Sequence, residues 1–380
     1  MIIEVTGTNT WNKGAELMLV AIRERFLARY PDYTIAVDGS FGSYADRANY
    51  QLKQKVNRGR WGKTRLALTL LSRSFRDAYG LAFDEDIDAV LDASGFAFGD
   101  QHPTRRIVEF ADQVDIWRRY GCPVILLPQA LGPFDNPVQR ECFRRIASSA
   151  SHIFARDTVS FQHACGAAES DENITMAPDF TNLVTPPSSV KLPGDRMACI
   201  VPNQRMIEKA GSDEAADAYE PLLEHAILAL QGRGMECFLL VHGVHDETLA
   251  SALRDRVGGI RIVRESDPVR IKAILGAVDV VVASRFHALV SALSQGVPAI
   301  ATSWSHKYEQ LFSDYACENL VLPVPCPPDR VQEAVDHVAG AARQDLIETI
   351  RSRGSILKEQ SRTMWNEVET IIGLAGPAGG

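Results

Sequence analysis

The stretch VVVASRFHALVSALSQGVPAI, residues 280–300, decides the fold class. An apolar run leads into the polar tetrad Ser284-Arg285-Phe286-His287, and an apolar helical pattern follows it. That helix should end at Gly296, with Pro298 just beyond it, before a second apolar run begins. Strand, loop, helix and strand in this order are typical of a βαβ unit, which belongs to a parallel sheet.

The same alternation continues on both sides of this unit. In the first half the predicted strands are Ile2–Thr6, Thr34–Val37, Ala89–Ala93, Val124–Leu127, His152–Ala155 and Ile174–Ala177, with helices at Ala15–Tyr30, Ile107–Tyr120 and Pro137–Ser148. In the second half they are Ala198–Val201, Glu236–Val241, Ile260–Val263, Val278–Val282, Ala299–Thr302 and Leu320–Leu322, with helices around 217–231, 246–257, 268–276, 287–295, 306–314 and 328–341. The pattern therefore predicts two consecutive series of βα units.

A segment rich in Pro, Ser and Gly around 185–195 separates the two series. We therefore predict two doubly wound α/β domains, residues 1–188 and 189–345. Residues 346–373 should form a long helix, broken around Gly354, that packs back across the boundary between the domains.

Composition narrows the class of protein. The 380 residues are 46% hydrophobic and 23% charged, as in soluble globular proteins, and the net charge of −8 gives no general attraction to nucleic acid. The seven cysteines form no CxxC pair, which favours reduced thiols in a cytoplasmic protein over disulfides or a zinc site. The basic, amphipathic stretch 47–76 could contact an anionic membrane or a charged polymer, or be a solvated helix and loop.

Polar and cationic residues follow the predicted strands of the second half. Open α/β sheets bind ligands at the carboxyl ends of their strands, so these residues are the candidates for a site. Arginine offers a planar fork for phosphate or carboxylate, histidine can act as acid or base near neutral pH, and a serine at this position can cap the following helix. The candidates are Arg205, His242, Ser284, Arg285, His287, His306 and Lys307.

His242 and His245, followed by Asp246, could suggest a metal site. No third ligand with suitable spacing accompanies the two imidazoles. We therefore expect no metal there, and favour a sugar or phosphate contact or a simple loop.

Residues suited to sugar hydroxyls follow the strands of the first half. The candidates are Asn9, Asn12, Lys13, Gly14, Glu16, Asp100, Gln129 and Asp179. Amides both donate and accept hydrogen bonds, and carboxylates accept them, as hydroxyl recognition requires. Ordinary turns with a capping side chain are the alternative interpretation, and Asp157, three residues before Ser160, is expected to be such an N-cap.

Several of these segments, in order, resemble the polysaccharide pyruvyl transferase family. They are Asn12-Lys13-Gly14-Ala15-Glu16, Leu127-Pro128-Gln129 with Gly132-Pro133-Phe134, Arg156-Asp157 with Ser160, Ala177-Pro178-Asp179, and Ser284-Arg285-Phe286-His287-Ala288-Leu289 with Gly296-Val297-Pro298. The resemblance runs from about residue 5 to residue 315, and the last block is its most specific part. It departs at Ala15, where many relatives carry Asp, so no role of that carboxylate is carried over.

The resemblance implies a fold like that of B-type glycosyltransferases, with two Rossmann-like domains facing across a cleft. It implies transfer of the enolpyruvyl-derived group of phosphoenolpyruvate, a co-substrate, onto a saccharide that could be lipid-linked, without a metal or other cofactor. Arg285 and His287 then match the family's Arg-x-His pair, and Arg205 is similar to its arginine early in the second domain. Arg285, His287 and Asp179 are the catalytic candidates, and Asp179 or Asp100 would orient the acceptor. A glycosyltransferase that uses nucleotide sugars and a saccharide-binding protein without turnover are the two alternatives.

Overall fold

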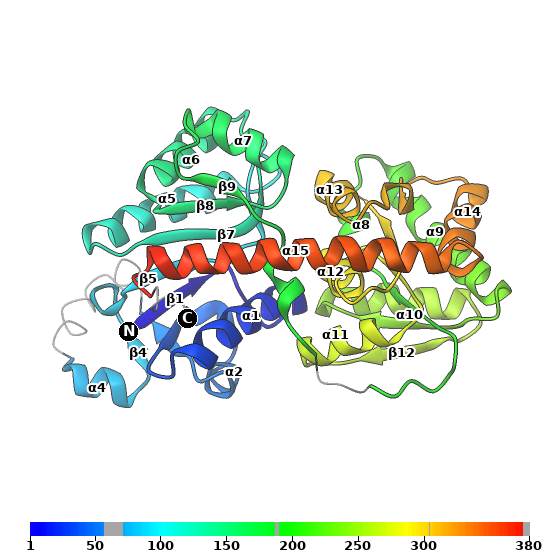
Figure 1. Cartoon of the computed structure of the whole chain (residues 1–380), viewed down its shortest axis with the longest axis horizontal. Helices are drawn as coiled ribbons and strands as arrows, with labels where there is room; N and C mark the ends of the chain where they lie inside the picture. The colour runs from blue at the N-terminus through cyan, green and yellow to red at the C-terminus, as the bar shows by residue number, and fades with distance from the viewer. Residues whose placement is uncertain (57–70, 187–189, 304, 375–380) are drawn as a thin grey trace. The chain divides into compact units, whose positions relative to one another are not determined.

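The computed structural model describes residues 1–56, 71–186, 190–303 and 305–374. By its contacts the chain divides into two units. The first comprises Met1–Thr10, Met18–Asp179 and Ser361–Gly380, and the second comprises Trp11–Leu17 and Phe180–Gln360. Figure 1 shows a sheet with helices packed on it in each unit, which confirms the predicted α/β class.

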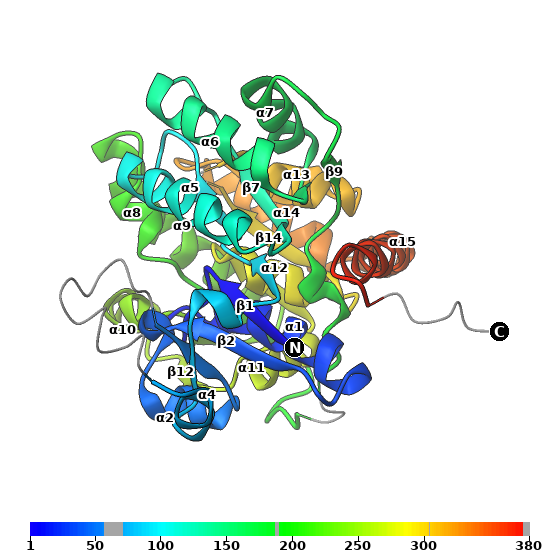
Figure 2. The ribbon, with the colours of Figure 1, turned by 90° about the vertical axis from the view of Figure 1, so that its left-hand side faces the viewer.

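The first unit is built on a parallel sheet in the order β4-β3-β2-β1-β5-β7-β8-β9, with β6 paired to β7. These strands are β1 (Ile2–Thr6), β2 (Thr34–Asp38), β3 (Lys53–Lys55), β4 (Leu81–Ala82), β5 (Ala89–Asp92), β6 (Phe96–Phe98), β7 (Val124–Leu131), β8 (His152–Ala155) and β9 (Ile174–Met176). The described helices are α1 (Lys13–Arg29), α2 (Tyr44–Asn49), α4 (Arg73–Ala78), α5 (Thr104–Arg119), α6 (Pro137–Ser149) and α7 (Thr158–Ala168). Figure 2 shows α5, α6 and α7 in a row over this sheet, where α6 packs against both of its neighbours.

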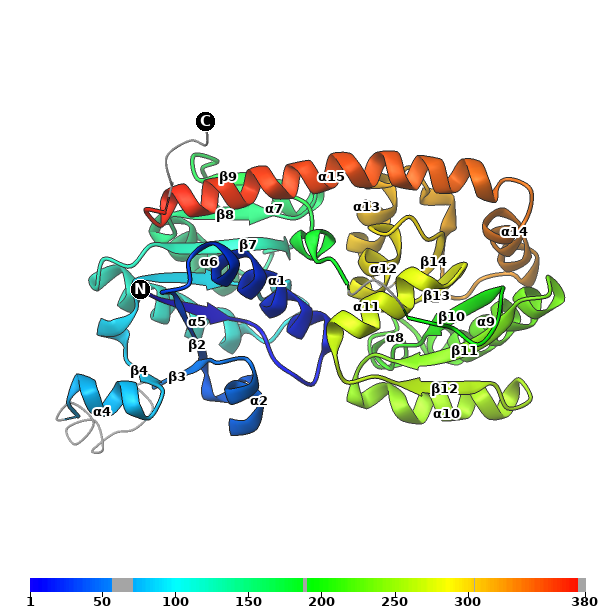
Figure 3. The same cartoon turned by 60° about the horizontal axis from the view of Figure 1, so that its bottom comes forward.

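The second unit contains a parallel sheet in the order β12-β11-β10-β13-β14-β15. Its strands are β10 (Met197–Val201), β11 (Glu236–Val241), β12 (Arg261–Arg264), β13 (Val280–Ala283), β14 (Ala299–Thr302) and β15 (Val321–Leu322). Its helices are α8 (Arg205–Glu208), α9 (Asp213–Gly232), α10 (Glu247–Arg256), α11 (Pro268–Ala277), α12 (Phe286–Leu293), α13 (His306–Asp314) and α14 (Pro328–Ala339). Figure 3 shows α9 beside α14 and α11 beside α12. Counted within the unit, the strand order is 3-2-1-4-5-6, that of the Rossmann fold.

The central strands are buried on both faces because helices cover both sides of each sheet. All residues of β5, β7, β10 and β13 are buried. A strand covered on both sides is mostly apolar, and this explains why these segments are near-continuous hydrophobic runs; the polar exceptions are Asp92 at the end of β5 and Gln129 in β7.

The predicted break in the last helix is wrong. Helix α15 (Arg343–Ile371) runs through Gly354 without interruption. Gly354 is buried, and a Cβ atom there would lie 3.4 Å from the Tyr315 ring. This is an ordinary van der Waals distance, so Gly354 is a glycine tolerated inside a continuous helix and is not a helix terminator.

Much of the basic stretch 47–76 lies outside the described residues. Three of its described cations form ion pairs: Lys53 with Asp77, Lys55 with Glu4 and Asp84, and Arg76 with Glu85 and Asp86. None of the described helices is long and apolar enough to cross a membrane. Contact of the 47–76 stretch with a membrane stays a prediction.

Candidate active site

The loops after β10 and β13 lie at the point where the second sheet changes direction. These two strands are neighbours, with Val201 opposite Ala283, and the chain leaves them toward strands on opposite sides. Ligands of doubly wound sheets bind at such a switch point, where loops diverge and helix N-termini face outward. Asn203-Gln204-Arg205 follow β10, and Ser284-Arg285-Phe286-His287 follow β13.

Ser284 holds the loop after β13 through hydrogen bonds of its side chain and its backbone oxygen. Its side chain is fully buried, and its Oγ lies 2.5 Å from both the Tyr219 Oη and the Thr302 Oγ1. Its backbone oxygen accepts hydrogen bonds from Asn203 Nδ2 at 2.8 Å and from Tyr308 Oη at 2.9 Å. Ser284 does not cap α12, whose N-cap residue is Arg285 without a side-chain hydrogen bond, so the predicted capping role is wrong. Its hydroxyl is engaged in the core instead of at a ligand surface.

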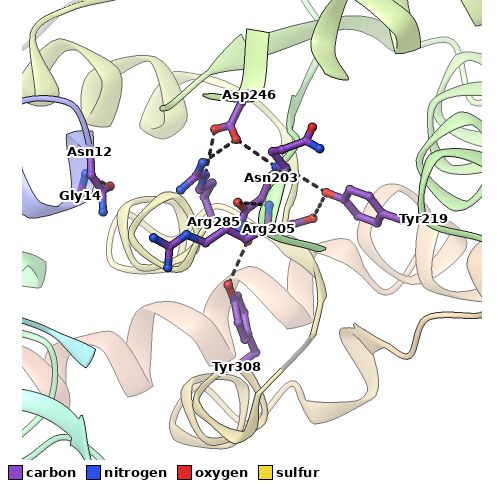
Figure 4. A network of polar contacts seen from close by, with 10 residues as sticks. Asn12, Gly14, Asn203, Arg205, Tyr219, Asp246, Arg285 and Tyr308 are labelled. Carbon is purple, nitrogen blue, oxygen red and sulfur yellow. Dashed lines mark hydrogen bonds and ion pairs between the residues drawn. The ribbon is translucent and has the colours of Figure 1, made fainter. Parts of the chain in front are cut away.

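Arg285 is fixed by a buried carboxylate. Its Nε lies 2.9 Å from Asp246 Oδ2 and its Nη2 lies 2.5 Å from Asp246 Oδ1, while the Gln204 backbone N–H donates to the same Oδ1 (Figure 4). Asp246 is fully buried, and a Cβ at Gly243 would lie only 2.8 Å from Nη2. A two-pronged pair of this kind fixes the plane of the guanidinium group as well as its position.

The first turn of α1 packs on the loops after β11 and β13. Asn12 forms an isolated β-bridge with Gly243, the Lys13 backbone N–H donates to the His242 backbone oxygen at 3.5 Å, and Asn12 Oδ1 accepts the Gly14 N–H. A Cβ added to Gly14 would lie 2.3 Å from His287 Nδ1. Only glycine allows the imidazole this close to the helix backbone. The residues Trp11–Leu17 accordingly belong to the second unit, although the rest of α1 belongs to the first.

His242 lies among these cationic groups and is held neutral. Burial lowers the pKa of His242 well below its usual value, and the charges of Arg285, His287 and Lys13 lower it further. Its Nδ1 has no hydrogen-bond partner among the described residues. Lys13 Nζ lies 2.6 Å from Glu16 Oε2. We call Lys13, His242, Arg285 and His287 the cationic cluster.

The remaining second-half candidates lie nearby in the same unit. Arg205 is exposed at the start of α8. His306 lines a cavity of about 340 Å³ together with Lys209 and Glu309. The Nζ of Lys307 lies over the ring of Phe286 at 5.7 Å, an arrangement that favours a cation electrostatically.

The other acceptor-side candidates belong to the first unit. Asn9 lies in the loop after β1, and Asp100 accepts hydrogen bonds from the backbone N–H groups of Asp135 and Asn136, a loop-bracing role. Gln129 is buried in β7, and Asp179 forms a buried ion pair with Arg156 at 3.4 Å. The N-cap prediction for Asp157 is confirmed: its side chain accepts the Ser160 N–H at 2.7 Å at the start of α7.

A family model for polysaccharide pyruvyl transferases matches residues 12–306. The chain belongs to the polysaccharide pyruvyl transferase family. The match begins at the α1 turn that packs on the cationic cluster and includes the loop after β13, so it contains every member of the cluster. The search of curated protein sequences gave no match.

Solved structures similar to this chain share its fold. A putative UDP-N-acetylglucosamine 2-epimerase from Listeria monocytogenes has a TM-score of 0.61 at 10% identity, over 97% of this chain and 95% of the other. Anabaena HepE in complex with UDP and glucose has a TM-score of 0.58 at 12% identity, over 97% and 99%. A glycosyltransferase from Rickettsia africae has 0.57 at 12%, over 98% of both chains. These likenesses confirm the predicted glycosyltransferase-B-like fold.

Several residues that hold the candidate site residues in place were not predicted from the sequence. Asp246, which orients Arg285, was considered only as part of a doubtful metal motif, and among the described residues no group of three or more His, Cys, Asp or Glu is placed to hold a metal ion. Tyr219 and Tyr308, which hold Ser284, lie in helical patterns without any local signal. Only Asp246 could have been found from the sequence. It follows β11, which lies next to β10, so its loop lies at the same edge of the sheet as the predicted site residues.

Proposed function

We propose that this pyruvyl transferase converts phosphoenolpyruvate and a saccharide diol into a cyclic pyruvate ketal and phosphate. Two hydroxyl oxygens form bonds to C2 of the pyruvyl group, and the C2–O bond to phosphate breaks. One hydroxyl proton is balanced by the proton added to the methylene carbon, and the other leaves with phosphate. The cationic cluster carries this proposal, because phosphoenolpyruvate presents a phosphate and a carboxylate that need several fixed N–H donors.

Each member of the cationic cluster has a chemical task in this scheme. Arg285, already oriented by Asp246, and Lys13, on the first turn of α1, would bind the anionic groups of phosphoenolpyruvate. Neutral His242 would accept or donate a single hydrogen bond without adding charge. His287 would exchange a proton with the methylene carbon or with the attacking hydroxyl, the role a positioned imidazole serves best.

A cytoplasmic site of reaction, with a saccharide precursor that could be lipid-linked, agrees with this co-substrate and with seven cysteines that are all free. Contact of the 47–76 stretch with a membrane would bring the enzyme to such a precursor.

Phosphate release from phosphoenolpyruvate tests the proposal. The purified chain is incubated with phosphoenolpyruvate and a panel of p-nitrophenyl hexosides, and products are identified by mass. We expect release that depends on the hexoside, and a product that has gained pyruvate less one water. His287→Ala should reduce turnover to a small residual rate while leaving the unfolding temperature unchanged, and full activity of this variant would remove His287 from the mechanism.

The same assay separates the two alternatives. Turnover with UDP-hexoses and none with phosphoenolpyruvate would favour a nucleotide-sugar glycosyltransferase. Hexoside binding without turnover of either donor would favour a saccharide-binding protein.

A further inference from the structure

The first sheet has a switch point of its own, between β1 and β5. Thr6 ends β1 and lies opposite Asp92, which ends β5, while Gln129 lies on the adjacent strand β7. Ser94 follows β5 by two residues. These four side chains meet at the carboxyl edge of the sheet, and we call them the hydroxyl edge.

Asp92 is a fully buried carboxylate held by neutral donors. Its Oδ1 accepts hydrogen bonds from Thr6 Oγ1 at 2.8 Å and Ser94 Oγ at 2.6 Å, and its Oδ2 accepts one from Gln129 Nε2 at 2.8 Å. Within the described part of the chain Asp92 has no cationic partner. Burying a charge without a counter-charge is costly, so the arrangement calls for an explanation beyond packing.

The carboxylate fixes the polarity of the groups around it. A hydroxyl has one proton, and Thr6 and Ser94 give theirs to Asp92, so that only lone pairs remain for a ligand. Both side chains are partly exposed. Gln129 donates one N–H of its NH₂ group to Asp92, and its Oε1 is buried without a partner among the described residues. The two hydroxyls of the hydroxyl edge and the Gln129 Oε1 therefore offer hydrogen-bond acceptors.

The loop after β1 is shaped around Ser94. Gly7 has φ +80°, and a Cβ there would lie 2.3 Å from Ser94 Oγ and 2.5 Å from its Cα. A glycine is required both by the backbone conformation and by this approach. This close approach lets the hydroxyls of Thr6 and Ser94 donate to the same oxygen of Asp92. The conformations of the loops after β1 and β5 together therefore position the two acceptors.

We infer that the hydroxyl edge binds hydroxyl groups of the acceptor saccharide, and that Asp92 is a positioning residue for Ser94 and Thr6. As an acceptor site for the transfer, it rests on the proposed function. Sugar hydroxyls can donate hydrogen bonds to these acceptors. A phosphate or carboxylate would face the lone pairs of both hydroxyls beside a buried negative charge, which disfavours phosphoenolpyruvate at this position.

Titration of the full chain with p-nitrophenyl hexosides in the absence of phosphoenolpyruvate tests this inference. Ser94→Ala and Thr6→Val should each weaken binding of the preferred hexoside by about 3- to 10-fold, the effect of one hydrogen bond. Asp92→Asn should weaken it by about 10-fold or more, because an amide would no longer orient both hydroxyls. Thr34→Val makes the same change at the opposite edge of the sheet, at the start of β2, and should leave binding unchanged.

The KM values in the phosphate-release assay supply the second measurement. All three variants should raise the KM for the hexoside and leave the KM for phosphoenolpyruvate unchanged, with an unfolding temperature close to that of the parent for Ser94→Ala. Unchanged hexoside binding by Ser94→Ala and Thr6→Val, or no saturable binding of any hexoside by the parent at millimolar concentration, would overturn the inference.

Failure of the proposed function gives a different result. Hexoside binding that the variants weaken, together with no phosphate release by the parent, would leave the hydroxyl edge as a saccharide site and remove pyruvyl transfer.

Discussion

Gly14→Ala should separate the proposed activity of this family member from its stability. The added Cβ would lie 2.3 Å from His287 Nδ1, whereas ordinary contacts begin at 3.4 Å, so the ring must move by about 1 Å. A displacement of this size at a reacting group lowers the rate by about 100-fold. The backbone of Gly14 is outside the left-handed region, so alanine itself introduces no backbone strain.

The cost in stability should be small. Overpacking destabilises by about 1–3 kcal/mol, while alanine in place of glycine in a helix recovers up to about 1 kcal/mol. We therefore expect a loss of about 0–2 kcal/mol in the free energy of unfolding, measured with urea. Gly166→Ala is the matched control, since it lies inside α7 with no atom within 4 Å of the added Cβ. It should stabilise the chain slightly and leave turnover unchanged.

A double variant tests whether the lost rate is lost through His287. If Gly14→Ala acts by displacing the imidazole, adding it to His287→Ala should lower the remaining rate no further, because the two changes remove one interaction. Two independent, multiplicative losses would refute this reasoning. So would a Gly14→Ala enzyme with the parent's kcat and KM, since it would show that the position of His287 is not used in the reaction.

Three further changes test the surroundings of the cationic cluster and the last helix. Asp246→Asn leaves Arg285 without its buried counter-charge, so in urea titrations it should lower the free energy of unfolding by about 3 kcal/mol. It should also raise the KM for phosphoenolpyruvate. The exposed control Asp255→Asn should lower the free energy of unfolding by less than about 0.5 kcal/mol. Burial holds the pKa of His242 below its unfolded value of 6.5, so the unfolded chain binds the extra proton first and stability falls as pH falls below 6.5. Urea titrations between about pH 7.5 and about pH 5.5 should show this loss in the parent and a weaker pH dependence in His242→Gln. Gly354→Ala should stabilise α15 by about 0.5–1 kcal/mol in thermal or urea unfolding, and a marked loss would mean that the neighbouring ring cannot tolerate a methyl group.

The strand pattern was predictable wherever strands are apolar on both faces. The predicted limits of β1, β8, β11 and β14 are those of the structure. Strand β3 was not predicted, because its sequence Lys-Gln-Lys is typical of a solvated segment. In the structure Lys55 is buried between Glu4 and Asp84, each 2.7 Å away, and no local pattern signals that a lysine will find two carboxylates from distant segments.

The cationic residues of the site were predictable for a related reason. Arg285 and His287 follow a buried strand and precede a helix, so their place at the sheet edge is fixed by a few neighbouring residues. Their partners are fixed by tertiary structure. Asp246 reaches Arg285 from the loop after β11, and Gly14 meets His287 only because the first turn of α1 belongs to the second unit. Local patterns thus predicted the candidate residues Arg285 and His287, but not the residues that position them.

The two switch points have opposite polarity, and this decides which substrate each can hold. After β13 the cationic cluster presents N–H groups, with Asp246 paired to Arg285 and Glu16 paired to Lys13. After β5 the hydroxyl edge presents oxygen lone pairs around a carboxylate whose hydrogen bonds all come from neutral groups. Reversing the roles would place a phosphate against lone pairs around the buried charge of Asp92, which costs more than the about 1–3 kcal/mol of an unpaired neutral group. On our two proposals, the same sheet topology supplies an anion site in one unit and a hydroxyl site in the other, according to the side chains that end its strands.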